Sequence, residues 1–249
     1  AAIDTNPAPR ALETARIVAV VGAGPAGLMA AYAAASRGAK VVLFDRNPEP
    51  GRKLLLTGGG RCNVTHEGDW SEMTGAYFGG GRFLYPAFLA LSNRDTAAWF
   101  ESRGVPLIRE DSGKVFPRSD RASDVRDALL NTCREAGVEV RAGIRIRGIV
   151  PKDGWFRLQA GNRTGWEAAA VVLATGGLSY PATGSDGDGL RWAIKLGIPV
   201  VPTRPALAPV RSADSWVGRL AGVSVDPVRA FLIRKSGEAG EEPAGLKSR

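Results

Sequence analysis

Three glycines and one aspartate near the start of the sequence have the types and spacing needed to bind a dinucleotide. Gly22, Gly24 and Gly27 form a GxGxxG pattern, and Asp45 follows Gly27 by 18 residues. In such a pattern the first glycine permits a sharp turn, the second lets a pyrophosphate approach the backbone, and the third allows a helix to pack closely on a strand. A carboxylate placed as Asp45 is can accept hydrogen bonds from a ribose 2′-hydroxyl. The chemistry expected here is the binding of a dinucleotide.

The residues around this pattern predict the elements that would hold it. Apolar runs indicate a strand over Ile17–Val21, a helix over about Pro25–Ser36 and a second strand over Lys40–Phe44. The N–H groups and the dipole at the helix start would then face the phosphates. Two other interpretations are a transmembrane span, since Ile17–Ser36 carries no charge, and a βαβ unit without a ligand. The glycines and Pro25 at the expected turn argue against the span.

A second glycine-rich segment follows Asp45. The triplet Gly58-Gly59-Gly60 permits backbone torsions and close approaches that other residues resist. Arg52, Lys53 and Arg61 surround it with positive charge. This charge suits phosphates or an electron-rich ring.

The charge balance raises the question of nucleic-acid binding. The chain of 249 residues has 33 lysines and arginines against 25 acids, a net charge of +8. The basic residues are spread along the chain without a long run of like charge, and no nucleic-acid-binding motif occurs. The pattern argues against nucleic acid as the main partner, while action on RNA stays open as an alternative.

Cysteine and histidine usage argues against a metal site and a dithiol redox centre. Cys62 and Cys133 lie 71 residues apart without a CxxC motif, and His66 is the only histidine. The glycine cluster at 184–189 resembles a calcium loop but lacks a glutamate at the twelfth position. We therefore expect no bound metal and a cytoplasmic protein.

The central part of the sequence predicts short helices and strands. A helix is expected over Arg121–Ala136, where Val125, Leu129 and Cys133 recur on one helical face. Cys133 is accordingly expected in the core. Further predictions are helices around Phe83–Leu91 and Asp95–Arg103, a short strand at 105–111, a turn at 113–120, and a helix over Leu190–Leu196 with Asp188 near its N-cap.

Residues 138–177 predict how the sheet is completed. Strand-like runs at 138–150 and 155–160 flank a Lys152-Asp153-Gly154 turn, and a third strand would follow the GNRTG turn. This β-meander precedes a buried apolar strand within Ala168–Gly177. The order is the one expected of FAD domains of the glutathione-reductase type, in which the last strand returns beside the first. The predicted fold class is α/β, a Rossmann-like FAD/NAD(P)-binding domain with a β-meander.

Composition divides the chain into three parts. Residues 1–16 are interpreted as a loose N-terminal tail, 17–203 as the FAD-binding Rossmann-like domain, and 204–249 as the start of an incomplete β-rich insert domain. Four prolines in PVVPTRPALAPV mark a crossing linker, and LAGVSVDPVRAFLIRK predicts two short strands beyond it.

Five strings occur in an order that resembles a known family. They are VVGAGPAGLMAA, GRKLLLTGGGRCNVT, GKVFPRSDRASDV, VVLATGGLSYPATGSDGDG and RPALAPV. The sequence is similar to the BaiN-like, aminoacetone-oxidase-type NAD(P)/FAD-dependent flavoproteins over about Ile17 to Val225. Members of that family usually carry glutamate where this chain has Asp45, and they run past this length. The chain is therefore expected to correspond to their N-terminal portion, with an open flavin site.

The resemblance implies FAD and a set of residues that would hold it. The glycine turn would contact the pyrophosphate, Asp45 the adenosine ribose, and the 52–63 segment the phosphates and flavin, while Ile146 would meet the adenine through its backbone. The implied cofactor-binding residues are Gly22, Gly24, Pro25, Ala26, Gly27, Asp45, Arg46, Arg52, Lys53, Thr57, Gly58, Gly59, Gly60, Arg61, Cys62, Asn63, Ile146, Ala174, Thr175 and Gly176.

Three functional hypotheses follow. The first is an FAD-dependent oxidoreductase that transfers hydride between flavin and a nicotinamide or small organic substrate, with NAD(P)H as a candidate electron donor. The second is a non-catalytic dinucleotide-binding module, and the third is a flavoprotein that acts on RNA. The sequence marks no catalytic acid or base, although Arg61, Asn63 and Tyr180 are expected near the flavin ring.

Overall fold

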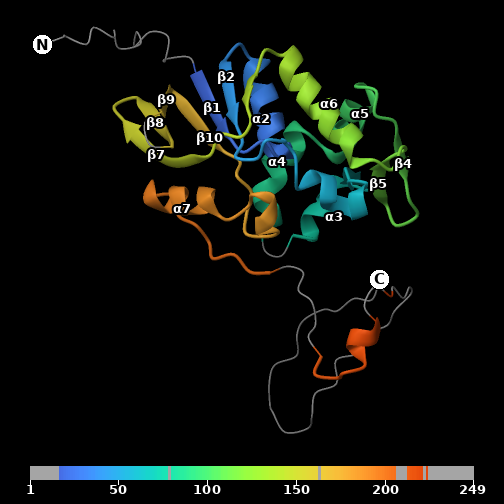
Figure 1. Ribbon diagram of the computed structural model, residues 1–249. Coiled ribbons are helices and arrows are strands. Elements are labelled where there is room, and N and C mark those ends of the chain that lie inside the picture. Colours follow the sequence, from blue (N-terminus) through green and yellow to red (C-terminus); the bar gives the residue numbers. More distant parts are fainter. Residues whose placement is uncertain (1–16, 78–79, 162–163, 206–211, 221–222, 224–249) are drawn as a thin grey trace, which may run out of the picture. The chain divides into compact units, whose positions relative to one another are not determined.

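The computed structural model describes residues 17–77, 80–161, 164–205, 212–220 and 223 (Figure 1). The predicted N-terminal tail, 1–16, lies outside the described residues. Contacts along the chain separate two units, residues 1–201 and 202–249. Each unit is considered by itself below.

The first unit is built on a parallel sheet of four strands. These are β1 (Ile17–Val21), β2 (Lys40–Phe44), β6 (Glu139–Arg141) and β10 (Ala170–Leu173), in the order β10-β1-β2-β6. The predicted bounds of β1 and β2 are confirmed, and β10 returns beside β1 with Val18 opposite Ala170. Strand β10 is only partly buried, whereas a buried strand was expected. Parallel pairing brings the carboxyl ends of β1, β2 and β10 together at one edge of the sheet.

Two helices pack together beside this sheet. Helix α2 (Pro25–Ala35) buries Leu28 and Ala31, and helix α6 (Ala122–Glu135) buries Leu129 and Cys133. The Cys133 thiol donates a hydrogen bond to the Leu28 carbonyl, 3.1 Å away. The predicted core position of Cys133 is confirmed, and both cysteines are free thiols.

An antiparallel meander covers a second core. Strands β7 (Ile146–Lys152), β8 (Trp155–Ala160) and β9 (Thr164–Ala168) form it, as predicted. Phe44 from β2 meets Trp166 from β9 with ring centroids 5.2 Å apart. In Figure 1 the meander and the α2/α6 pair lie on opposite sides of the parallel sheet. The sheet is thus enclosed between two hydrophobic clusters.

The segment between β2 and α6 differs most from expectation. The helix expected over Phe83–Leu91 is split into η2 (Gly81–Leu84) and α4 (Tyr85–Ala90), and α3 (Trp70–Gly75) was not predicted. The expected turn at 113–120 contains β5 (Lys114–Pro117), because Val115 and Phe116 are buried and pair with neighbouring strands. The remaining elements are η1 (Leu54–Gly60), β3 (Thr65–His66), α5 (Asn93–Glu101) and β4 (Leu107–Arg109).

The segment after β10 contains η3 (Pro181–Thr183) and α7 (Asp188–Lys195). Asp188 is the first residue of α7 and lies next to the N-cap, as predicted, and the cap itself is Gly187, which has a positive φ of 80°. The Asp188 carboxylate binds arginines.

The second unit contains η4 (Val217–Leu220) among its described residues. The two strands predicted beyond residue 220 fall almost entirely outside the described part of the chain. A β-rich insert starting at residue 204 therefore stays a prediction. Over the described ranges, no helix has both the length and the apolar character required to cross a bilayer.

The packing of α2 on β1 leads to a prediction about stability. A Cβ atom on Gly27 would lie 1.8 Å from the Gly22 carbonyl oxygen, whereas one on Gly24 meets nothing within 4 Å. We expect Gly27→Ala to lower the free energy of unfolding by about 2 kcal/mol or more, because backbone must move. Gly24→Ala is the control and should change it by less than about 0.5 kcal/mol. Thermal unfolding of the two variants measures the difference, and equal melting temperatures would contradict the prediction.

Candidate functional site

A cleft of about 600 Å³ opens at the carboxyl ends of β1, β2 and β10. Ligands of parallel α/β sheets bind in this position. Of the predicted cofactor residues, the structure brings these to the cleft wall: Gly22, Gly24, Pro25, Ala26, Asp45, Arg46, Arg52, Lys53, Ile146, Ala174, Thr175 and Gly176.

The glycine turn leaves backbone open toward the cleft. Gly22 has φ +106°, and a Cβ there would lie 2.3 Å from the Ala174 carbonyl oxygen, so the turn needs glycine. Gly24 has an ordinary φ of −75° and free space in front of it. Neither torsion nor packing within the chain therefore requires glycine at position 24. The space in front of Gly24 leaves the backbone at the start of α2 open to the cleft, and a pyrophosphate in that space stays a prediction.

Asp45 joins the end of β2 to the glycine turn. The Ala23 amide donates to Oδ2 at 2.6 Å, and the Asn47 amide donates to Oδ1 at 2.8 Å. The residue is 9% exposed and lines the cleft. An ionised carboxylate has about four acceptor positions, so acceptor capacity remains for ribose hydroxyls. Asp45 therefore has a structural role that the sequence did not indicate, besides the role predicted for it.

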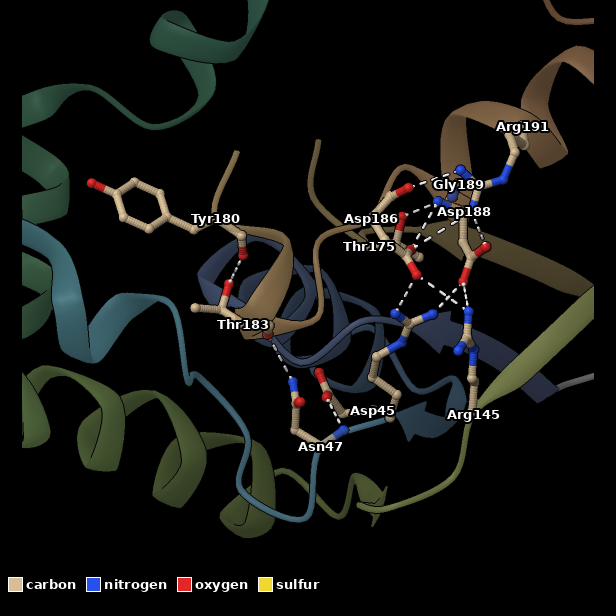
Figure 2. Close-up of polar contacts among 11 residues, drawn as sticks. Asp45, Asn47, Arg145, Thr175, Tyr180, Thr183, Asp186, Asp188, Gly189 and Arg191 are labelled. Atoms are coloured by element: carbon tan, nitrogen blue, oxygen red, sulfur yellow. Dashed lines mark hydrogen bonds and ion pairs between the residues drawn. The ribbon is translucent and has the colours of Figure 1, made fainter. Parts of the chain in front are cut away.

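Five charged residues form a cluster at one end of the cleft, and we call it the ionic clasp. Its members are Arg46 after β2, Arg145 before β7, and Asp186, Asp188 and Arg191 at the start of α7 (Figure 2). Arg46 binds Asp186 at 2.6 Å and also binds Asp188. Arg145 lies 3.2 Å from Asp186 and 3.1 Å from Asp188. The clasp ties three segments of the chain together across the end of the cleft.

Charge within the clasp shifts the protonation of Asp186. Partial burial acts to raise its pKa, but the hydrogen bond and the charge of Arg46 outweigh that effect and hold the pKa below its ordinary value. A carboxylate with a depressed pKa stabilises the folded state above about pH 4, and this contribution is lost as the pH falls.

The loop between β10 and α7 crosses the cleft and is held at several points. The Gly189 amide donates to Thr175 Oγ1 at 3.0 Å, and the Asn47 side chain donates to the Thr183 carbonyl at 3.1 Å. Lys53 Nζ donates to the Ser179 carbonyl at 2.7 Å, and burial lowers the pKa of Lys53. Arg46 of the clasp and Thr175 and Gly176 of this loop were predicted as site residues, whereas Arg145, Asp186, Asp188 and Arg191 were missed. The signal was the GSDGDG run, which we interpreted only as a turn before a helix.

Eight of the predicted cofactor residues are not among those that line the cleft. Gly27 lies beneath the turn, packed against Gly22. The other seven belong to the 57–63 loop: Thr57, Gly58, Gly59, Gly60, Arg61, Cys62 and Asn63. Their contact with a cofactor stays a prediction.

Arg61 is the best-held side chain of the 57–63 loop. Its guanidinium lies 3.9 Å from the centre of the Phe116 ring and donates to Glu110 at 2.7 Å. The next residue, Cys62, is buried and has φ +63°. Asn63 contacts the backbone of Val115 in β5. The loop is therefore fixed against the β3-β5-β4 sheet.

Metal binding has no support in the described residues. They contain no group of three or more histidine, cysteine, aspartate or glutamate side chains that could hold an ion. The His66 ring nitrogens face the backbone carbonyls of Glu67 and Ser112.

Comparison with known proteins gives one family over most of the chain. The family described as HI0933-like protein Rossmann domain matches residues 16–237. The ribosomal RNA dihydrouridine synthase of Haemophilus influenzae is 31% identical over 225 residues, which are 87% of this chain and 55% of that protein. The Escherichia coli protein of the same name is 32% identical over 222 residues, 84% of this chain and 52% of that protein.

A relative with another name is similar to the same extent. The 3-dehydro-bile acid delta(4,6)-reductase of Clostridium scindens is 31% identical over 219 residues, 87% of this chain and 52% of that protein. The chain thus spans about half the length of these relatives.

Two of the solved structures that match this chain illustrate the shared fold. The open conformation of a flavocytochrome c3 fumarate reductase matches with a TM-score of 0.51 and 23% identity, over 73% of this chain and 40% of that one. A 3-ketosteroid-delta4-(5alpha)-dehydrogenase from Rhodococcus jostii matches with a TM-score of 0.50 and 19% identity, over 66% and 46%. These likenesses support the Rossmann-type architecture.

The ionic clasp leads to a prediction about stability. Replacing Asp188, whose side chain is 14% exposed, by asparagine removes the charge that three arginines share. We expect Asp188→Asn to lower the free energy of unfolding by about 1.5–3 kcal/mol, the range for hydrogen bonds to charged groups. Asp127→Asn is the matched control, because Asp127 is half exposed and pairs with Arg126 alone. Chemical denaturation should show that the control lowers the free energy of unfolding by less than about 0.5 kcal/mol. Equal losses of stability in the two variants would contradict a special role for the clasp.

Proposed function

Because the chain belongs to the HI0933-like Rossmann-domain family, we propose that it is the FAD-binding part of an oxidoreductase that reduces a carbon–carbon double bond. The observation that carries this proposal is the open backbone of Gly24 in the cleft, opposite the buried carboxylate of Asp45. The cofactor is FAD, which agrees with the family and with the return of β10 beside β1 after a meander.

The residues of the cleft fit FAD in one orientation. The start of α2 at Gly24, Pro25 and Ala26 would hold the pyrophosphate, with helix N–H groups donating to it. Asp45 would accept from the adenosine ribose, which places the adenosine near the ionic clasp. Lys53 would lie toward the other end of the cofactor. When bound, FAD supplies hydride transfer, while the chain binds, orients and shields it.

The relatives support the choice of reaction. Their names describe a dihydrouridine synthase and a delta(4,6)-reductase, and a further relative from Shewanella frigidimarina, 28% identical over 90% of this chain and 46% of that protein, is named a probable fumarate reductase. Each of the three names implies saturation of a carbon–carbon double bond next to a carbonyl group. We therefore propose that class of substrate for the whole protein, with NAD(P)H as the electron donor and the reducing cytoplasm as its location. No residue of this chain is assigned as the catalytic acid or base.

RNA is the second candidate substrate. Two relatives at 31% and 32% identity are named for action on ribosomal RNA, and the net charge of +8 would favour a polyanion. Sequence pattern alone argued against nucleic acid, and the relatives reopen that alternative. Retention of a ribosomal RNA fragment that weakens steeply between about 50 and 200 mM salt would support it.

One experiment tests the proposal directly. The purified chain is reconstituted with FAD, its visible spectrum is recorded, and the released cofactor is identified. We expect a yellow protein that contains FAD and is bleached by NADH or NADPH. Bleaching by dithionite alone would favour a non-catalytic binding module. A chain that does not retain flavin under any condition would refute the proposal.

The free space at Gly24 predicts a variant that loses flavin without losing the fold. Gly24→Val would place two methyl groups where the pyrophosphate is proposed to lie, and its Cβ atom would meet no other atom within 4 Å. We expect FAD affinity to fall at least tenfold while the melting temperature of the apoprotein is unchanged. Gly75→Val is the control, since Gly75 is also open but lies outside the cleft. Undiminished flavin occupancy in Gly24→Val would remove the pyrophosphate from this turn.

The hydrogen bonds of Asp45 lead to the prediction that replacing it lowers both the stability of the protein and its affinity for FAD. In Asp45→Asn a single carbonyl oxygen replaces two acceptor oxygens, so one of the Ala23 and Asn47 amides loses its partner. Hydrogen bonds to a charged group contribute about 1.5–3 kcal/mol, which predicts roughly ten- to a hundredfold weaker FAD binding. The free energy of unfolding of the apoprotein measures the loss of the backbone hydrogen bonds to residue 45. The FAD dissociation constant from flavin titration measures the loss of its proposed hydrogen bond to the ribose. A dissociation constant changed less than about twofold would assign Asp45 a structural role only.

A further inference from the structure

Tyr180 has a backbone conformation and an exposure that the fold does not explain. Among the described residues, three other than glycine have positive φ: Cys62, Asp120 and Tyr180. Cys62 is buried, and Asp120 belongs to a residue type that tolerates this region and faces Arg61 at 3.5 Å. Tyr180 has φ +52° and ψ +58° yet leaves its side chain 70% exposed. Glycine or asparagine adopts this backbone conformation at a lower energetic cost than tyrosine does. The ring is not buried, so packing in the core does not explain a tyrosine at this position.

The backbone on both sides of Tyr180 is firmly held. Its carbonyl accepts hydrogen bonds from the Thr183 hydroxyl at 2.7 Å and the Thr183 amide at 2.9 Å. The preceding carbonyl, of Ser179, accepts from Lys53, and the carbonyl of Thr183 accepts from Asn47. Lys53 and Asn47 both line the cleft. The loop is therefore tied to the cleft wall, while the phenol ring projects from it.

The ring lies away from the ionic clasp. In Figure 2 the Tyr180 side chain extends in the opposite direction from Asp186, Asp188 and Arg145. With the adenosine near the clasp, the opposite direction is the one in which the flavin and its substrate would lie. Strained residues that the surroundings hold in place occur often at ligand-binding positions.

We propose that Tyr180 is a substrate-positioning residue whose ring stacks on a flat, conjugated carbonyl ring held for reduction. This inference rests on the proposed function and adds the shape of the substrate. A phenol ring fixed by a rigid backbone offers a face for stacking at little entropic cost, and stacking requires only a planar π-surface on the ligand. A uracil ring and a ring enone share that chemistry.

Two variants separate the contributions of Tyr180. Tyr180→Gly removes the ring and keeps the turn, and Tyr180→Phe removes the hydroxyl group and keeps the ring. Glycine removes the ring and also relieves the positive φ, so the melting temperature should stay equal or rise. Phenylalanine retains the stacking face without the hydroxyl group. FAD titration of each variant should match the wild type within about twofold, because Tyr180 is not among the residues that line the cleft.

Equilibrium dialysis with two probes, uridine 5′-monophosphate and 4-androstene-3,17-dione, tests the proposal with and without FAD. We expect one probe to bind the wild type, Tyr180→Gly to weaken that binding about tenfold or more, and Tyr180→Phe to retain it within about twofold. The probe that binds shows whether the substrate ring is a uracil or a ring enone.

Four results would overturn the proposal. They are probe binding that Tyr180→Gly leaves unchanged, a loss in Tyr180→Phe equal to that in Tyr180→Gly, no binding of either probe to the wild type, and a lowered melting temperature in Tyr180→Gly. Failure of the wild type to hold FAD would instead refute the proposed function, and the dialysis without FAD would still report on Tyr180.

Discussion

The hydrogen bond between the Ala23 amide and the Asp45 carboxylate is the interaction on which the site depends. It is 2.6 Å long and joins the glycine turn after β1 to the end of β2. The same two strand ends are joined by the Gly22 amide, which donates to the Phe44 carbonyl at 2.8 Å. A buried carboxylate without partners would be costly, and here backbone N–H groups satisfy both of its oxygens. The cleft is thus shaped by the acid before any ligand enters.

The two ends of the cleft differ in chemistry, and this difference gives the site a direction. At one end the ionic clasp gathers three arginines and two aspartates. Toward the other, Lys53 holds the Ser179 carbonyl, and the neighbouring Tyr180 is exposed. The clasp carries three positive and two negative charges, so its own ion pairs neutralise most of the charge at that end.

The sequence predicted the parts of the fold that local pattern determines. Strands β1 and β2 were placed at their observed bounds because buried parallel strands are continuous apolar runs, and the meander followed from its turns. Strand β5 was missed because it forms by pairing with β3 and β4, which is a tertiary effect. Its own sequence, four residues that end in proline, does not indicate a strand. The ion pairs of the clasp were missed for the same reason, since Arg46 and Asp186 are 140 residues apart. Glycines and Asp45 could be found because their spacing is local, whereas ion pairs between loops leave no periodic signal.

One segment, residues 175–191, links the ionic clasp to the loop that carries Tyr180. It begins at Thr175, whose hydroxyl accepts from the Gly189 amide, and it ends at Arg191 in the clasp. Between them lie Tyr180 and Thr183, held to the cleft wall through Lys53 and Asn47. These contacts fix the segment at the clasp and again at the loop that carries the Tyr180 ring, so the backbone of both parts is held by side chains of the cleft wall.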